Sequence, residues 1–148
     1  MKGQTLIETV LALGIIAIIL SGVTIVVTSS LSDASFSQNQ TLATQYAQEG
    51  TEILRTIRSS DYAGFNKNGT YCLAKGALTL PSSSPSCTAP NVDSFIRSVS
   101  IVKDGCSAKV AQTTVTVSWS DNKCSSGSYC HSSNLISCLS TISPIQAP

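Results

Sequence analysis

A run of 24 residues without any charge, from Thr9 to Ser32, constrains this chain more than any other feature. Leu, Ile, Val and Ala make up most of the run as far as Val27. A helix of that length extends about 36 Å, which exceeds the hydrocarbon thickness of a bilayer, about 30 Å. A cleaved secretory signal has a shorter apolar stretch, of about 7–15 residues, that ends at a small-residue cleavage site. The sequence therefore favours a permanent single membrane span near the N-terminus.

Glu8 immediately precedes this apolar run and needs an explanation. An ionised carboxylate near the centre of a membrane costs about 2.5–3.5 kcal/mol on insertion scales. One interpretation is that Glu8 lies close to the helix start, where it reaches the lipid headgroups and interacts favourably with the helix dipole. The other interpretation is that Glu8 meets a positive charge supplied by another copy of the chain.

The first residues resemble the processing signal of type IV prepilins and pseudopilins; they read Met1-Lys2-Gly3-Gln4-Thr5-Leu6-Ile7-Glu8. In that family a membrane-embedded peptidase cuts after the Gly of a short basic leader. The new N-terminal amine is usually methylated, and a Glu stands at the fifth mature position. The resemblance implies a leader of residues 1–3, cleavage between Gly3 and Gln4, and methylation of the Gln4 amine. One departure is Gln4 itself, where the family usually has Phe.

The resemblance also implies a role for Glu8 in assembly. After cleavage, the amine of Gln4 in one subunit can approach Glu8 of a neighbour, and the apolar Leu6 and Ile7 join the same contact. Two opposite charges attract strongly in a low-dielectric environment, whereas each charge alone is costly there. The implied partners are a prepilin peptidase/methyltransferase, other pilin subunits, an inner-membrane assembly platform and, before assembly, membrane lipid.

A helical pattern continues beyond the apolar run. Small and apolar residues recur at i, i+3, i+4 and i+7; they are Ala43, Tyr46, Ala47, Gly50, Ile53, Leu54 and Ile57. The opposite face is polar and comprises Gln45, Gln48, Glu49, Glu52, Arg55 and Thr56. No Pro interrupts the run, so we expect one helix from Gln4 to Arg58, of about 80 Å. Two helices joined near residues 29–39 remain the alternative.

The rest of the chain, residues 59–148, reads as a small β-rich head. Strands are expected at 95–102 and 110–120, joined by a turn at Lys103-Asp104-Gly105, with weaker strands near 70–74 and 135–142. Within the 110–120 strand, Val115, Val117 and Trp119 alternate with Thr114, Thr116 and Ser118. This alternation predicts one buried and one wet face.

These elements predict an α+β fold, in which a long N-terminal helix packs on a small antiparallel sheet, and this arrangement matches the pilin architecture. The predicted divisions are the leader at 1–3, the transmembrane or filament-core helix at 4–28, the amphipathic second half of that helix at 29–58, and the disulfide-containing head at 59–148. Three stretches resemble minor pilins of the PilV type: Val115-Thr-Val-Ser-Trp119, Tyr46-Ala-Gln-Glu-Gly50 and Glu52-Ile-Leu-Arg-Thr-Ile-Arg58.

Six cysteines follow the apolar run; they are Cys72, Cys87, Cys106, Cys124, Cys130 and Cys138. An even number on the side expected to be exported predicts three disulfides, with 15 possible connectivities. Short-range pairing is the favoured prediction: Cys72–Cys87, Cys106–Cys124 and Cys130–Cys138. A zinc or haem site is disfavoured, because the Cys124, Cys130 and His131 spacing fits neither pattern. We therefore expect no metal, with His131 in a surface loop.

The composition argues against several function classes. Only 11% of residues are charged and the formal net charge is +1, whereas nucleic-acid-binding domains need a basic footprint. Aromatic residues amount to 5%, which disfavours a base-stacking surface. The single His leaves no convincing nucleophile–base pair, so we expect no enzyme, cofactor or small-molecule substrate.

Two functions from different classes remain. The first is a structural subunit of a type IV pilus or related helical filament, in particular a minor pilin; a pseudopilin of a type II secretion or DNA-uptake system is a variant of this reading. The second is a membrane-anchored extracellular binding domain that does not polymerise. In either case, Lys2 predicts that the N-terminus lies in the cytoplasm and the head outside, with the filament subunit later reaching the cell surface.

Overall fold

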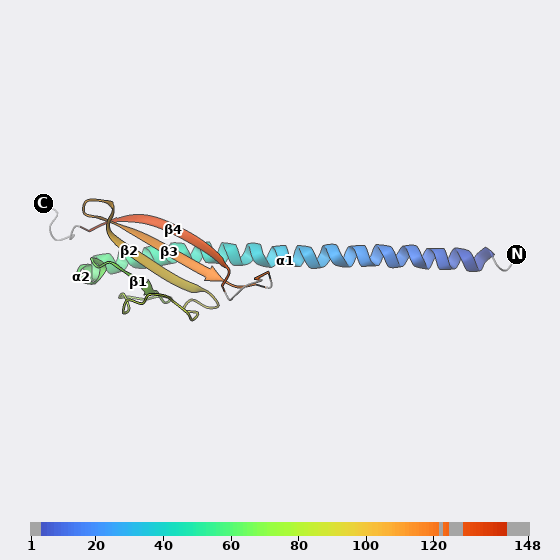
Figure 1. The fold of residues 1–148 in the computed structure, drawn as a ribbon, viewed down its shortest axis with the longest axis horizontal. Helices are drawn as coiled ribbons and strands as arrows, with labels where there is room; N and C mark the ends of the chain where they lie inside the picture. Colours follow the sequence, from blue (N-terminus) through green and yellow to red (C-terminus); the bar gives the residue numbers. More distant parts are fainter. Residues whose placement is uncertain (1–3, 122, 125–128, 142–148) are drawn as a thin grey trace. The chain divides into compact units, whose positions relative to one another are not determined.

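The structure of the chain, a computed structural model, describes residues 4–121, 123–124 and 129–141. Its elements are α1 (Gln4–Ser60), α2 (Tyr62–Phe65), β1 (Gly69–Cys72), β2 (Ile96–Ser107), β3 (Val110–Trp119) and β4 (His131–Ser140) (Figure 1). The chain divides into two units, residues 1–38 and 39–148. A long N-terminal helix followed by a four-stranded antiparallel sheet confirms the α+β prediction.

Helix α1 is continuous from Gln4 to Ser60, so the alternative of two joined helices is wrong. No proline lies within this range, and every backbone N–H after the first turn can therefore donate along the helix. The helix ends two residues beyond the predicted Arg58. Asp61 follows it and caps α2, where its carboxylate accepts a hydrogen bond of 2.9 Å from the N–H of Gly64.

The sheet has the order β1-β2-β3-β4, and each neighbouring pair is antiparallel. In β3, Val115, Val117 and Trp119 are buried, while Thr114, Thr116 and Ser118 are half-buried on the other face, which confirms the predicted alternation. The partners of Val115 in the adjacent strands are Val99 and Leu135. The register therefore gathers the apolar side chains on one face of the sheet.

The C-terminal part of α1 packs on this apolar face. Ala43, Ala47, Gly50, Leu54 and Ile57 are buried, and Tyr46 and Ile53 are half-buried, as the helical pattern predicts. At Gly50 the helix and sheet approach so closely that a Cβ atom would lie 2.9 Å from Cγ1 of Val115 and 3.1 Å from Cδ of Arg97. Such contacts are shorter than van der Waals packing allows, so a glycine is needed there.

The prediction of a turn at Lys103-Asp104-Gly105 is wrong. Strand β2 continues to Ser107, and the two-residue turn consists of Ala108 and Lys109. Between Val102 and Ser107 the register with β3 shifts, and Asp104 adopts a left-handed φ of 57° within this irregularity. The Asp104 carboxylate accepts a hydrogen bond of 2.6 Å from the N–H of Lys109. Asp tolerates left-handed backbone, so the residue that suggested a turn supports a bulge instead.

All six cysteines form disulfides, but only one of the three predicted pairs is correct. Cys72–Cys87 is confirmed. The predicted Cys106–Cys124 and Cys130–Cys138 pairs are wrong, since the structure forms Cys106–Cys138 and Cys124–Cys130. Strand pairing explains the difference: Cys106 lies at the irregular end of β2 and Cys138 lies in β4, and both strands pair with β3. Short sequence separation therefore did not predict which cysteines lie close together in the fold.

Replacing each bridge by two alanines is expected to destabilise the head according to the loop that the bridge closes. The sequence separations of Cys106–Cys138, Cys72–Cys87 and Cys124–Cys130 are 32, 15 and 6 residues. The chain-entropy relation then gives losses of about 4, 3 and 2 kcal/mol in that order. The free energy of unfolding is measured by denaturant titration of the full chain in detergent, with Trp119, the one tryptophan, as the fluorescent probe. A larger loss for the shortest loop than for the longest would contradict this ranking.

Candidate functional site

The N-terminal part of α1 exposes apolar side chains around its whole circumference. Every residue from 6 to 31 is exposed; the large apolar members include Leu6, Ile7, Leu13, Ile18, Leu20, Ile25 and Leu31. We call residues 6–31 the apolar segment. A helix that packs against one surface needs a single apolar stripe, whereas a helix that is apolar all round is surrounded by lipid or by other apolar helices. The apolar segment is therefore the candidate functional site.

Several hydroxyl groups within the apolar segment are satisfied by the helix itself. The hydroxyls of Ser21, Thr24 and Thr28 donate hydrogen bonds of 2.5, 2.8 and 3.0 Å to the carbonyls of Ala17, Leu20 and Thr24. Such internal bonds remove the need for water, which an apolar environment does not provide. The hydroxyl-bearing residues thus remain compatible with lipid or with a packed helical core.

Helix α1 is also long and apolar enough to cross a membrane. The most apolar 18-residue window of the helix has a mean hydropathy of 2.9, and none of that window is buried. These properties fit single-pass membrane anchoring, as the sequence predicts.

Glu8 carries the one charged side chain of the apolar segment, and it is exposed there, as are its neighbours Leu6 and Ile7. Gln4 is the first residue of α1, four residues before Glu8. Gly3 and the rest of the proposed leader lie outside the described residues. The predicted cleavage site and the methylation of Gln4 therefore stay predictions.

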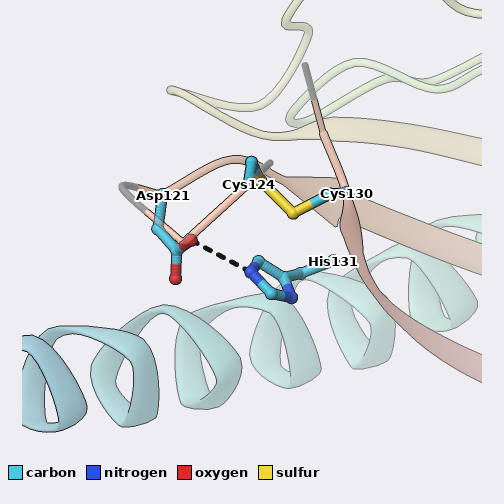
Figure 2. A group of neighbouring side chains, drawn as sticks. All are labelled: Asp121, Cys124, Cys130 and His131. Carbon is cyan, nitrogen blue, oxygen red and sulfur yellow. Dashed lines mark hydrogen bonds and ion pairs between the residues drawn. A yellow bond between two sulfur atoms is a disulfide. The ribbon is translucent and has the colours of Figure 1, made fainter. Parts of the chain in front are cut away.

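A second candidate site contains Asp121, Cys124, Cys130 and His131, whose ligand atoms lie within 4.8 Å of one another (Figure 2). The two sulfur atoms form a disulfide, so neither is a thiolate that could bind a metal ion. Nε2 of His131 lies 3.0 Å from Oδ1 of Asp121, and the ring packs on Trp119 at 5.5 Å between centroids. With the disulfide closed, this cluster is a stabilising contact at the end of the sheet.

The prediction that His131 lies in a surface loop is wrong. His131 is the half-buried first residue of β4. Burial alone would raise the pKa of Asp121. The hydrogen bonds that its carboxylate accepts from the N–H of Lys123 and from the ring of His131 have the larger combined effect, so the pKa lies below its usual value. The Cys- and Ser-rich composition around His131 suggested a loop. Register pairing of His131 with Trp119 makes it part of the sheet instead.

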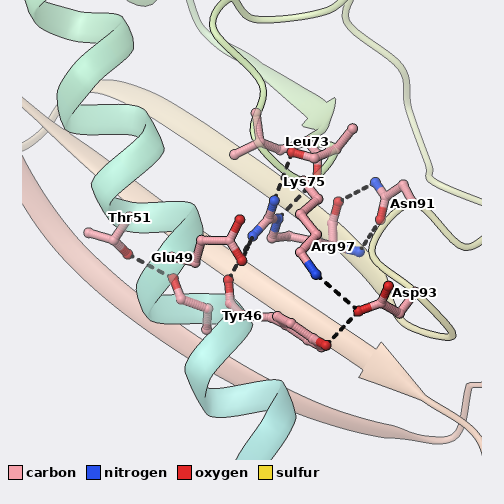
Figure 3. Close-up of polar contacts among 10 residues, drawn as sticks. Tyr46, Glu49, Thr51, Leu73, Lys75, Asn91, Asp93 and Arg97 are labelled. Atoms are coloured by element: carbon pink, nitrogen blue, oxygen red, sulfur yellow. Dashed lines mark hydrogen bonds and ion pairs between the residues drawn. The ribbon is translucent and has the colours of Figure 1, made fainter.

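A third cluster surrounds the guanidinium group of Arg97, which is fully buried between α1 and the sheet (Figure 3). Its nitrogens donate hydrogen bonds of 3.0, 2.8 and 3.0 Å to the carbonyls of Leu73, Ala74 and Tyr46. Nη1 also lies 3.5 Å from Oε2 of Glu49, which the sequence had placed on the polar face. Burial lowers the pKa of Arg97, and the charge of Glu49 partly offsets this effect.

The Arg97 cluster is structural, because its donors are committed to protein acceptors. Sequence reasoning missed it. The sequence did contain one indication of it: Arg97 lies on the same face of its strand as the inward-facing Val99 and Ile101. A buried charge needs paired groups, and these come from α1 and from residues 73–74, far apart in the sequence.

Asp93 and Tyr46 form a smaller contact beside this cluster. The hydroxyl of Tyr46 donates a hydrogen bond of 2.6 Å to the Asp93 carboxylate, and Nζ of Lys75 lies 3.5 Å from the same oxygen. The bond from Tyr46, and then the charge of Lys75, lower the pKa of Asp93. The same hydrogen bond, together with some burial, raises the pKa of Tyr46.

Comparisons of the chain with protein-family models, with curated proteins and with solved structures gave no match. The assignment of a function therefore depends on the residues and contacts described above. Among them, the apolar segment and Glu8 are the features that the stability of the isolated chain does not explain.

Arg97→Leu is expected to lower the free energy of unfolding by at least about 3 kcal/mol, because the buried bond to Leu73 and the part-buried bonds to Tyr46 and Ala74 lose their donor and Glu49 loses its partner. Arg55→Leu is the matched control. Arg55 lies on the exposed face of α1 and pairs with Glu52 at 2.6 Å in the solvent, so its loss should cost no more than about 0.5 kcal/mol. Both variants are measured by Trp119 fluorescence during denaturant unfolding. Equal effects would show that the buried guanidinium does not hold α1 to the sheet.

Asp93→Asn is expected to reduce stability at neutral pH but not in strong acid. The pKa of Asp93 in the folded chain lies below its ordinary value of 3.8, so its contribution is present above that pH and is lost as the pH falls through the folded-state value. Asn tolerates the left-handed φ of 50° at this position, which limits backbone effects. The difference in denaturation midpoint between the original chain and Asp93→Asn is measured from pH 7 to pH 2 (roughly the range of carboxyl titration). A difference that persists unchanged through this range would refute the assigned contacts of the Asp93 carboxylate with Tyr46 and Lys75.

Proposed function

We propose that the chain is a structural subunit of a type IV pilus or related helical filament, most specifically a minor pilin. In this proposal a prepilin peptidase removes residues 1–3, the amine of Gln4 is methylated, and α1 anchors the subunit in the membrane before it enters the filament. The head is exported and ends at the cell surface. The subunit catalyses no reaction itself.

The single observation that carries the proposal is the position of Glu8. Its carboxylate lies exposed on a helix whose other exposed residues, up to position 31, carry no charge. A lone charge in an apolar environment is costly, but a pair of opposite charges is stabilised. The free amine that cleavage creates at Gln4 lies four residues away, about 6 Å along the axis of α1. A neighbouring helix shifted by about that distance would bring its amine level with Glu8.

The exposed surface of the apolar segment gives further support. It is apolar on all sides, so it suits a bundle in which each helix has several neighbours. Apolar contact alone does not select one axial offset between helices, whereas the pairing of the amine with Glu8 does. A monomeric membrane anchor would need the apolar surface but would not need an acidic residue at this position.

Glu8→Ala is expected to lower the amount of the chain in sheared filaments by at least about tenfold, because loss of the ion pair removes more than about 1.4 kcal/mol of subunit contact. Glu52→Ala is the control, since it removes an exposed acid from the same helix. Sheared and cell-bound fractions are compared by immunoblot in cells that assemble filaments. Membrane insertion of the Glu8 variant should be unchanged.

Intact mass of the cell-bound chain separates assembly from processing. Both variants should lack residues 1–3 and carry one additional methyl group. Normal filament incorporation of Glu8→Ala would refute the proposed ion pair. A chain that keeps its leader in cells with an active prepilin peptidase would instead support the non-polymerising extracellular domain.

A further inference from the structure

A groove lies in the head, on the face of the sheet away from α1. It has a volume of about 580 Å³, within the range of about 300–1,000 Å³ typical of small-molecule sites. The described residues that line it are Thr70, Pro85, Ser86, Cys87, Thr88, Ile96, Ser98, Ser118 and Tyr129. We call this site the hydroxyl groove. All of these residues belong to the unit of residues 39–148.

Strand register explains the floor of the groove. Ile96 pairs with Ser118, and Ser98 follows Ile96 by two residues on the same face of β2. Arg97, between them, faces α1. Ile96 is only 7% exposed although it lies on the outer face of the sheet. The groove walls therefore cover part of a surface that would otherwise be open to solvent.

Two disulfides hold the walls in place. Cys87 lines the groove and is bonded to Cys72 of β1, while the N–H of Ser84 donates a hydrogen bond of 2.9 Å to the carbonyl of Thr70. Tyr129 immediately precedes Cys130, which is bonded to Cys124. Walls that are fixed before binding reduce the entropy lost when a ligand is captured.

The backbone of Tyr129 is in a strained conformation. Its φ is 64°, in the left-handed region that a bulky residue seldom adopts. Such strain costs about 1–3 kcal/mol and persists only where the surroundings impose it. Strain of this kind is common at ligand sites, and here it places an aromatic residue at the edge of the hydroxyl groove.

The groove is rich in hydroxyl groups. Six of the residues that line it carry one: Thr70, Ser86, Thr88, Ser98, Ser118 and Tyr129. Within the described part of the chain, none of these side-chain hydroxyls is engaged by another protein group. Each hydroxyl both donates and accepts hydrogen bonds, so together they can match a ligand that presents hydroxyls of its own.

The described lining residues carry no charge. An anionic or cationic ligand would lose its hydration there without gaining an opposite charge, which is unfavourable. A saccharide presents hydroxyls at its edge and C–H groups on its ring faces. The hydroxyls of the groove can form hydrogen bonds with the saccharide hydroxyls. Ile96, Pro85 and Tyr129 offer apolar contacts for the C–H groups of the sugar ring.

We infer that the hydroxyl groove binds a neutral saccharide unit. This inference goes beyond the proposed function and does not rest on it, because the groove lies entirely within the head. A free monosaccharide and one unit of a longer glycan share the same chemistry. Methyl glycosides and trisaccharides distinguish these two sources, because a trisaccharide extends beyond one sugar unit and a methyl glycoside does not.

The full chain is titrated by calorimetry in lauryldimethylamine oxide, a detergent without a sugar headgroup that could compete. The probes are methyl glycosides and trisaccharides of glucose, galactose, mannose, xylose and N-acetylglucosamine. At least one should bind with a Kd of about 1 mM or lower. Glucuronic and galacturonic acid probes should bind at least about tenfold more weakly, because their carboxylates find no positive charge.

Matched valine substitutions locate the binding. Ser98→Val and Ser118→Val remove hydroxyls from the groove and should weaken binding by about tenfold each, the effect of one lost hydrogen bond. Ser100→Val and Thr116→Val are the controls, since both residues are half-buried on the same face and strands but do not line the groove. They should change the Kd by less than about twofold. Trp119 fluorescence verifies that each variant is folded.

Three results would overturn the inference. The first is the absence of measurable binding for every neutral probe at 10 mM (roughly ten times the expected upper limit of Kd). The second is an equal loss of affinity in the control variants, which would place the binding elsewhere. The third is tighter binding of the uronic acids, or of a neutral Ser- and Gly-rich peptide, than of any neutral saccharide.

Discussion

The buried guanidinium group of Arg97 links three parts of the head that are distant in the sequence. It donates to carbonyls of α1 and of the segment after β1, and it faces the carboxylate of Glu49. Burying one charge fixes where each acceptor must lie, because any misplaced acceptor leaves the charge uncompensated. Gly50 permits the close approach that these contacts require. These contacts fix the position of α1 on the sheet. They therefore also decide which face of the sheet remains uncovered by α1.

The head relies on covalent links and hydroxyl groups where other domains use large cores and surface charges. Only 11% of the residues are charged, and three disulfides close loops around a four-stranded sheet. Disulfides stabilise chiefly by limiting the unfolded chain, and they persist in oxidising compartments. Two of them also fix the walls of the hydroxyl groove. Stability and the proposed recognition of saccharides thus use the same constraints.

The apolar segment and the head have opposite solvent requirements. Residues 6–31 expose apolar side chains on all sides, whereas the head buries most of its large apolar residues and presents hydroxyls. In the proposed function, a lipid bilayer would satisfy the first requirement before assembly, and neighbouring helices would satisfy it afterwards. In the proposed filament, Glu8 sets the offset between these helices.

The sequence by itself determined the long helix, the buried stripe around Leu54 and the alternation of β3, because each depends on local periodicity. The place of Glu8 immediately before an uncharged apolar run also came from local spacing. Only the tertiary structure decided the Cys106–Cys138 bridge, the burial of Arg97 and the convergence of Ser98 with Tyr129. These depend on strand register and on the packing of α1 and the loops against the sheet, which join residues far apart in the sequence, and no local pattern records them.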